Sequence, residues 1–190
     1  MNLKTICVFG DSLVYGVGDS QEGGWVSRLQ SKLKEKYNLR NYGIPGDHSG
    51  DLLERIDEEC KEKKPDIIIF SIGANDSQYK EKEEVNFIKL KTFKENLEKL
   101  FTYAKKITPE IIFVGLPRMN DSVTTKWNFA WHFCNKNLEK YDSEIKNFCE
   151  KNNLQYIPIY DLMGKGDLSD GAHPNNEGYK KIAERIQTFL

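Results

Sequence analysis

The chain has 190 residues, and its 28 Lys and Arg residues nearly balance 29 Asp and Glu residues, so the formal net charge is -1. This balance offers no basic surface for nucleic acid or an acidic membrane, because such binding depends on concentrated Lys and Arg. Aromatic residues make up 12% of the chain, which is too many for a disordered protein and typical of a folded one.

Short apolar runs bounded by polar residues or glycine recur along the chain and predict buried strands. These runs cover Ile6 to Phe9, a weaker Leu39 to Tyr42, Ile67 to Ile72, Ile111 to Leu116 and Tyr156 to Tyr160. Helical patterns lie between them and after the last: Trp25 to Tyr37, Leu52 to Lys61, a long stretch ending near Ile107, one centred on Leu138 to Phe148, and Tyr179 to Phe189. Strands and helices therefore alternate throughout.

This alternation predicts an α/β fold, a three-layer α/β/α sandwich around a five-stranded parallel sheet with right-handed crossovers. No repeat, low-complexity tract or long linker divides the sequence, so we expect one domain over residues 1–190. The polar stretch from Pro117 to about Lys126 is the best candidate for a functional loop. Ligands of such folds bind at the carboxyl ends of the strands.

Targeting and metal signals are weak in this sequence. The apolar run near the amino terminus is too short for a signal peptide, and no run approaches the roughly 18 apolar residues of a membrane span. We expect a cytoplasmic protein without stable membrane insertion. The four cysteines, Cys7, Cys60, Cys134 and Cys149, have no metal-site or redox spacing, so no metal and no cofactor is predicted.

Four polar blocks fall at the predicted active edge of the sheet. They are Gly10-Asp11-Ser12-Leu13, the Gly43 to Asp47 segment, Gly73-Ala74-Asn75-Asp76 and Asp170-Gly171-Ala172-His173. Each block alone is ordinary turn and cap chemistry. Together they contain a nucleophile, oxyanion donors and a base with an orienting carboxylate, which is the set of groups that a serine hydrolase needs.

With these four blocks in order, the sequence resembles the SGNH hydrolases, also called the GDSL family of lipases and acylhydrolases. The likeness continues through Tyr15-Gly16-Val17-Gly18 to Gly24-Trp25 and runs from the first strand to the last helix. It implies a flavodoxin-like sandwich, in agreement with the strand and helix pattern. It also implies a serine esterase that works without a cofactor.

The resemblance and the chemistry of each residue together assign the catalytic roles. Ser12 is expected to be the nucleophile and His173 the base that removes its proton. Asp170 precedes His173 by three positions and would orient the imidazole, although a backbone carbonyl could do so instead. The Pro174 that follows suits the first turn of the last helix.

The resemblance also implies three oxyanion donors, the backbone N–H of Ser12, the backbone N–H of Gly46 and the side-chain amide of Asn75. Glycine would allow a close backbone approach at position 46. Asp11 and Asp76 are expected to be structural and to accept bonds from loop N–H groups.

Other histidines and aromatics are weaker candidates. We expect His48 at a turn or pocket rim and His132 in a surface or packing role. The segment Trp127 to Phe133 follows the fourth strand, and its aromatics would either wall an acyl pocket or pack a helix start. Trp131 is expected in the core, whereas Phe129 and Phe133 leave that stripe and are candidate substrate-binding residues.

The predicted function is a serine carboxylester hydrolase that cleaves small or single-chain acyl esters or thioesters through an acyl-enzyme. The alternatives are a carbohydrate O-acetyl esterase of the same superfamily and a non-catalytic flavodoxin-like binding domain. Phosphate-loop and complete dinucleotide fingerprints are absent, as is the G-x-S-x-G elbow of α/β-hydrolases. The expected partner is a small acyl ester. Oligomeric state and the exact ester cannot be read from the sequence.

Overall fold

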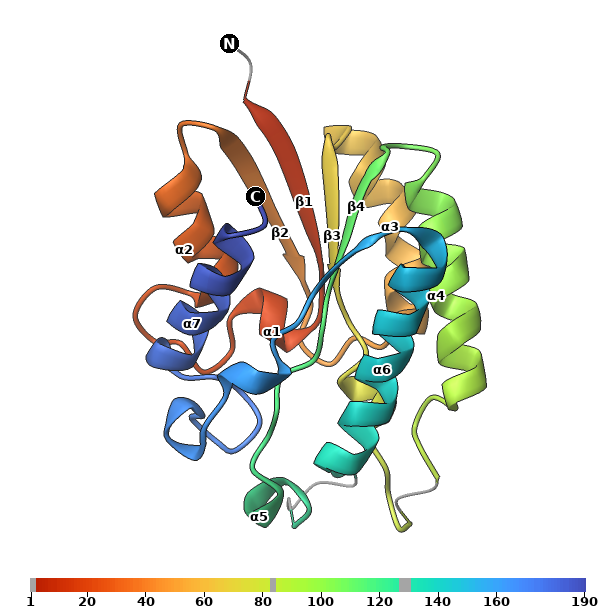
Figure 1. Cartoon of the computed structure of the whole chain (residues 1–190), viewed down its shortest axis with the longest axis vertical. Helices are drawn as coiled ribbons and strands as arrows, with labels where there is room; N and C mark the ends of the chain where they lie inside the picture. Colours follow the sequence, from red (N-terminus) through yellow and green to blue (C-terminus); the bar gives the residue numbers. More distant parts are fainter. Residues whose placement is uncertain (1–2, 83–84, 127–130) are drawn as a thin grey trace.

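The computed structural model describes residues 3–82, 85–126 and 131–190. Within them, five parallel strands form one sheet in the order β2-β1-β3-β4-β5 (Figure 1). Their bounds are β1 Lys4–Gly10, β2 Tyr37–Gly43, β3 Ile67–Ser71, β4 Glu110–Val114 and β5 Gln155–Ile157. The predicted five-stranded parallel sheet is confirmed.

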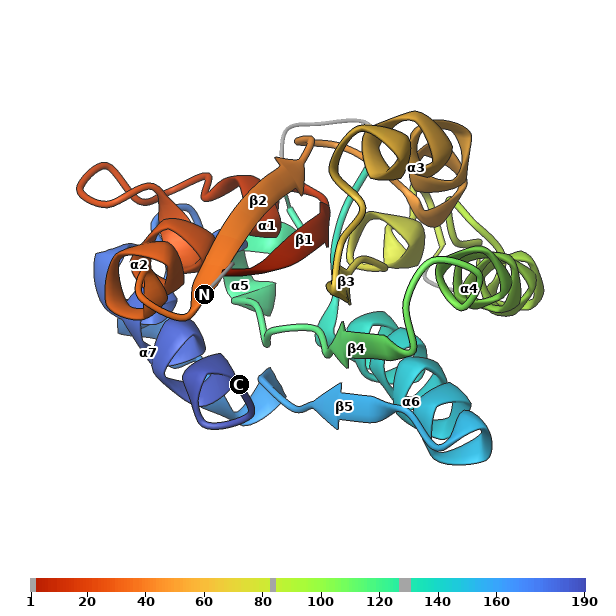
Figure 2. The same ribbon diagram turned by 90° about the horizontal axis from the view of Figure 1, so that it is seen from above.

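Helices cover both faces of the sheet and complete the predicted three layers. Figure 2 shows α2 and α7 on one face and α3, α4 and α6 on the other. The α-helices are α1 Ser12–Tyr15, α2 Gly24–Leu33, α3 Ser49–Lys63, α4 Leu90–Ala104, α5 Asp121–Thr124, α6 Asn135–Asn152 and α7 Asn176–Gln187. Short 3-10 turns are η1 Asn75–Ser77, η2 Tyr160–Leu162 and η3 Lys165–Asp167.

Side chains of the central strands alternate between two apolar clusters, as the strand period of two requires. On β1, Cys7 and Phe9 pack toward α3, α4 and α6, whereas Ile6 and Val8 pack toward α2 and α7. Burial on both faces explains why the central strands read as continuous apolar runs. The edge strand β2 buries only Leu39 fully, which is why its sequence signal is weak.

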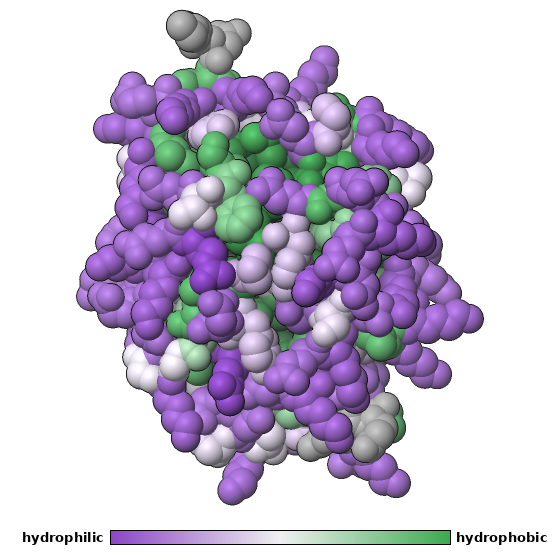
Figure 3. Space-filling model, in the orientation of Figure 1, coloured by the Kyte–Doolittle hydropathy of each residue, from purple (hydrophilic) through white to green (hydrophobic). Residues whose placement is uncertain are grey.

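The outer faces of the helices are polar. Figure 3 shows that hydrophilic residues cover most of one face of the molecule, with apolar atoms visible mainly between the flanking helices. The Lys and Glu residues of these helices thus form their solvated sides. Within the described ranges, no helix has the length and apolar character needed to cross a membrane.

Several element ends differ from the sequence prediction. The helix expected to reach Tyr37 ends at Leu33, because Tyr37 opens β2 and pairs with Lys4 of β1. The last two strands end earlier than predicted, at Val114 and Ile157. Pro158 follows Ile157 and has no N–H to continue the ladder.

The strand order places a topological switch between β1 and β3, because the chain leaves β1 toward one side of the sheet and returns to β3 on the other. Ser12 follows β1 and Asn75 follows β3, so both lie beside this switch. Gly10 is required there, since a Cβ at this position would lie 2.1 Å from the carbonyl oxygen of Ser71. The fold therefore brings the polar blocks to the edge where ligands bind in such sheets.

Candidate active site

Ser12 is the first residue of the short helix α1, which begins directly after β1. The carboxylate of Asp11 caps this helix, with Oδ1 accepting from the backbone N–H of Leu13 at 2.9 Å. The cap turns the chain sharply and leaves the Ser12 side chain at the carboxyl edge of the sheet. Its Oγ lies 2.9 Å from Nε2 of His173.

His173 is held between Ser12 and Asp170. Its Nδ1 lies 2.7 Å from Oδ2 of Asp170, while Oδ1 of Asp170 accepts from the backbone N–H groups of Ala172 and His173 at 2.9 and 2.8 Å. Burial raises the pKa of Asp170, but the bonds from His173 and Ala172 outweigh burial and hold the pKa below its usual range. An ionised carboxylate only accepts, so Nδ1 carries a proton and the neutral ring presents Nε2 as an acceptor to Ser12.

The loop around His173 is braced by its own backbone. The Ser169 N–H donates to the His173 carbonyl at 2.8 Å, and Leu168 bridges to Pro174. Asn175 caps α7 by accepting from the Gly178 N–H at 3.1 Å. Pro174 therefore precedes the cap and does not lie in the first helical turn, in contrast to the sequence prediction, because the Asn175 side chain supplies the better N-cap.

Gly46 and Asn75 come from two further loops and are linked by one residue. The Asp47 N–H donates to the Ile44 carbonyl at 3.2 Å, which closes a turn in which Gly46 has φ +93° after Pro45. This left-handed conformation favours glycine. A Cβ on Gly46 would meet no protein atom within 4 Å, so backbone conformation, rather than close packing within the protein, is what requires glycine.

Asn75 belongs to η1 and donates from Nδ2 to the Asp47 carbonyl at 2.9 Å. The backbone N–H of Ser12, the backbone N–H of Gly46 and the amide of Asn75 thus come from the ends of β1, β2 and β3. The Asn75 amide is bonded to the turn that contains Gly46, and the Ile44 N–H of that turn donates to the Gly10 carbonyl before Ser12. The three predicted donors therefore lie in hydrogen-bonded loops at the same edge of the sheet.

Two buried acids within these blocks, Asp11 and Asp76, accept hydrogen bonds from the surrounding backbone. Asp76 accepts from the backbone N–H of Ser49 at 3.0 Å and from the Ser49 hydroxyl. Asp11 binds the Leu13 N–H, while its Oδ2 is buried without a partner in the described part of the chain. Burial raises the pKa of Asp11 to about 7 and also raises that of Asp76, despite their bonds to N–H groups.

An aromatic stack, which sequence reasoning missed, lies beside the Gly46 turn. The His48 ring stacks on Phe87 with centroids 4.1 Å apart, and Phe87 meets Trp131 edge-on at 4.5 Å. Phe87 is 40% exposed and Trp131 is half-buried, so Trp131 does not lie fully in the core as expected. The three rings are far apart in the sequence and Phe87 and Trp131 lie on irregular backbone, so no periodic pattern in the sequence could have predicted that they stack.

The remaining histidines and phenylalanines that the sequence singled out lie outside the contacts of Ser12, His173 and Asp170 or outside the described residues. His48 is the N-cap of α3 and pairs with Asp51, and His132 lies against the Tyr79 ring at 5.6 Å. Phe133 is 5% exposed and packs in the larger apolar cluster. Phe129 lies outside the described residues.

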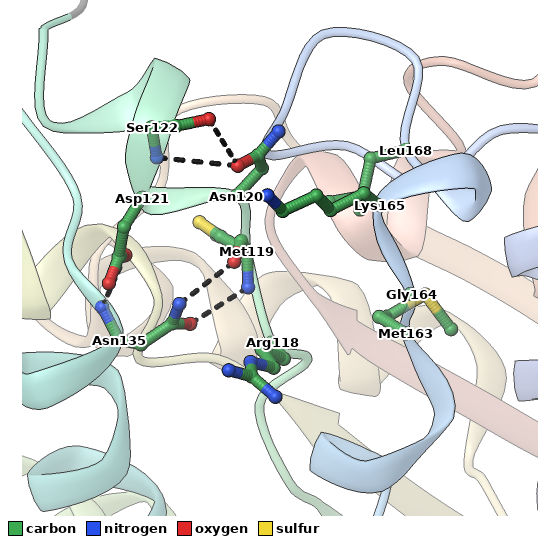
Figure 4. Close-up of a pocket in the computed structure, with 10 residues that line it drawn as sticks. All are labelled: Arg118, Met119, Asn120, Asp121, Ser122, Asn135, Met163, Gly164, Lys165 and Leu168. Carbon is green, nitrogen blue, oxygen red and sulfur yellow. Dashed lines mark hydrogen bonds between the residues drawn. The ribbon is translucent and has the colours of Figure 1, made fainter.

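A cavity of about 300 Å³ adjoins the loop that carries Asp170 and His173 (Figure 4). Arg118, Asn120 and Lys165 are among its lining residues, with Met163 on one wall. The Asn120 N–H donates to the Gly171 carbonyl at 2.8 Å, so the wall formed by the segment after β4 also supports the His173 loop. Over the described ranges, no group of His, Cys, Asp and Glu has the arrangement of a metal site.

The contacts among Ser12, His173 and Asp170 have the geometry of the triad in serine-type ester hydrolases. The GDSL-like Lipase/Acylhydrolase family matches residues 8–181, and the chain belongs to this family.

Several known proteins are similar to the chain in sequence or in fold over most of its length. Thioesterase 1/protease 1/lysophospholipase L1 of Escherichia coli K12 is 32% identical, over 95% of this chain and 80% of that protein. The uncharacterized protein YpmR of Bacillus subtilis is 29% identical, over 95% and 79%. The fold matches the lipase/acylhydrolase of Enterococcus faecalis with a TM-score of 0.82 and 23% identity, over 98% and 95% of the two chains.

Proposed function

We propose that the protein hydrolyses small or single-chain acyl esters or thioesters through an acyl-enzyme formed on Ser12. The observation that carries this proposal is the continuous contact from Ser12 Oγ to His173 Nε2 at 2.9 Å and from His173 Nδ1 to Asp170 Oδ2 at 2.7 Å. Such an arrangement activates a serine hydroxyl that is otherwise a poor nucleophile.

The first half of the proposed reaction forms the acyl-enzyme. Nε2 of His173 takes the Ser12 proton as Oγ attacks the acyl carbonyl, and Asp170 stabilises the resulting imidazolium. The tetrahedral intermediate then collapses, and the leaving alcohol or thiol takes the proton from His173. In the second half, His173 removes a proton from water, the hydroxide attacks the acyl carbonyl, and the acid leaves as Ser12 regains its proton.

The negative oxygen of both intermediates needs donors that are fixed before the reaction. We propose the backbone N–H groups of Ser12 and Gly46 and the Asn75 amide for this role. Removing one such donor commonly costs about 3–4 kcal/mol of transition-state stabilisation. The Asn75 bond to the Asp47 carbonyl supports this proposal, because it limits the rotation of the amide before any substrate binds.

The acyl group is proposed to lie along the exposed face of Phe87. One face of this ring stacks on His48, which lies two positions after Gly46, and the ring makes a T-shaped contact with Trp131. Ile44, in the turn that contains Gly46, is another exposed apolar side chain, at 43%, and is included in the proposed acyl surface. A single acyl chain suits such a surface, and the name of the Escherichia coli relative includes thioesterase and lysophospholipase activities.

A cytoplasmic location stays a prediction.

A chain-length series of p-nitrophenyl esters, from acetate to dodecanoate, with the matching acyl thioesters and an acetylated xylo-oligosaccharide, tests the substrate class. The proposal expects turnover of the acyl esters or thioesters by the wild type and none by Ser12→Ala. Turnover of the acetylated sugar alone would favour the O-acetyl esterase alternative. No turnover of any substrate, by a folded wild type, would contradict the proposed function.

A further inference from the structure

Arg55 of α3 makes five hydrogen bonds at the carboxyl edge of the sheet. Its side chain is 17% exposed. Nε donates to Asp47 Oδ2 at 2.7 Å, and Nη1 donates to both carboxylate oxygens of Glu59 at 2.9 and 2.8 Å. Nη2 donates to the backbone carbonyls of Gly10 and Tyr42 at 3.1 and 2.9 Å. The five N–H groups of the guanidinium can therefore each find an acceptor.

The two carbonyls that Arg55 binds are at the ends of β1 and β2. Gly10 is the last residue of β1, two positions before Ser12, and its carbonyl also accepts from the Ile44 N–H at 3.0 Å. Tyr42 is next to the last residue of β2, before the turn that contains Gly46. One guanidinium thus joins the backbone segments that lead to the Ser12 N–H and the Gly46 N–H.

Asp47 extends this network to the third donor. Its carboxylate accepts from Arg55, and its own backbone carbonyl accepts from the Asn75 amide at 2.9 Å. Contacts therefore run from Arg55 through Asp47 to Asn75, and from Arg55 directly to the strand ends before Ser12 and Gly46.

We propose that Arg55 is a positioning residue that sets the relative placement of the three oxyanion donors. This inference rests on the proposed function of the site. A planar guanidinium can hold a carboxylate and two carbonyls in fixed directions, which the single ammonium group of lysine cannot reproduce. Because a displacement of about 1 Å can cost about 100-fold in rate, an error in this placement should appear in catalysis.

The positive charge of Arg55 also supports its role as a positioning residue. Asp11 and Asp76 are buried in the same region as Asp47, and burial raises the pKa of Asp47 while the Arg55 bond and charge oppose that rise. Arg55 thus favours the ionised form of the carboxylate that holds the turn. An uncharged residue at position 55 would leave Asp47 with a weaker bond and the turn less fixed.

The competing explanation is that Arg55 only attaches α3 to the sheet. Glu59 separates the two explanations, because it pairs with Arg55 one helical turn away and makes no hydrogen bond to a donor segment within the part of the chain that the structure describes. A purely structural ion pair would be weakened about equally from either side. A positioning role predicts that only changes at Arg55 or Asp47 disturb catalysis.

The test compares Arg55→Lys, Glu59→Gln and the remote control Arg185→Lys, measuring kcat, KM, melting temperature and the inhibition constant of an acyl trifluoromethyl ketone. That ketone forms a tetrahedral oxyanion on the serine and reports donor placement directly. We expect Arg55→Lys to lower kcat about 10- to 100-fold, with KM nearly unchanged and ketone inhibition weakened by a similar factor. Glu59→Gln and Arg185→Lys should keep near-wild-type kcat.

A kcat for folded Arg55→Lys within about twofold of wild type, or an equal loss in Glu59→Gln, would overturn the inference. If Arg55→Lys does not fold, Asp47→Asn provides the test, because it removes the charge while keeping the side-chain shape. Loss of both kcat and ketone binding in a folded Asp47→Asn supports the inference, and unchanged values overturn it. Ser12→Ala turnover equal to wild type would instead show that the proposed function itself is wrong.

Discussion

The carboxylate of Asp170 holds His173 twice, through the imidazole Nδ1 at 2.7 Å and through the backbone N–H at 2.8 Å. The double contact fixes both the ring and the loop that carries it. The 2.7 Å contact with Nδ1 supports Asp170, rather than the backbone carbonyl that the sequence left as an alternative, as the group that orients the imidazole.

Asp170→Asn is therefore expected to lower kcat by about 10³- to 10⁴-fold while the fold is kept. An asparagine can turn its NH₂ toward Nδ1, which places the ring proton on Nε2 and removes the acceptor that Ser12 needs. The measurement is kcat and KM with a p-nitrophenyl ester. Asp167→Asn is the matched control, since Asp167 lies in the same loop and pairs with Lys181. Equal kcat values for the two variants would contradict this role.

Asn75→Asp should lower kcat by about 10²- to 10³-fold, because an ionised carboxylate cannot donate to the oxyanion. The variant also places a carboxylate oxygen against the Asp47 carbonyl, so the melting temperature should fall. Asn96→Asp changes another buried amide, which contacts Ser49 and none of the proposed donors. We expect that control to lose stability without a comparable loss of kcat. Unchanged ester turnover in Asn75→Asp would remove Asn75 from the site.

Phe87→Ala should reduce the preference for long acyl chains. Each buried methylene contributes about 0.8 kcal/mol, so loss of the ring contact should lower kcat/KM for octanoate about 10-fold more than for acetate. The comparison uses p-nitrophenyl acetate and octanoate. Phe189→Ala provides the control, because this ring is 38% exposed at the chain end that lies away from the site (Figure 1). An equal change for both esters in Phe87→Ala would refute the acyl surface.

Asp11→Asn should change how stability depends on pH. The folded pKa of about 7 lies above the ordinary value of 3.8, so the folded state binds more protons between these values. Asp11 therefore lowers the free energy of unfolding as pH rises from about 4 to 7, by at most about 4 kcal/mol. Asparagine keeps an acceptor for Leu13 and removes this titration.

Urea unfolding at pH 5 and pH 8 measures that effect. Wild type should lose more stability between these pH values than Asp11→Asn does. Asp47 and Asp76 are present in both proteins, and their charges also raise the pKa of Asp11, so the difference between the two proteins reports Asp11 together with its interactions with these two acids. The same pH dependence in both proteins would show that Asp11 titrates normally in the folded state.

The sequence predicted the sheet because central strands that are buried on both faces have unmistakable apolar runs, as in Ile67 to Phe70. It predicted the polar blocks because they follow those strands directly. The end of α2 was missed, since pairing of Tyr37 with β1 overrides local helical periodicity. The contacts of Arg55 with Gly10 and of His48 with Phe87 depend on tertiary packing, which leaves no spacing rule in the chain.

Covalent labelling tests whether Ser12 is the nucleophile. The intact protein is treated with a fluorophosphonate and the modified peptide is identified by mass spectrometry. We expect one adduct, on Ser12, and a greatly slowed reaction in His173→Ala. A label found only on another serine, with Ser12 unmodified in folded protein, would show that Ser12 is not the nucleophile.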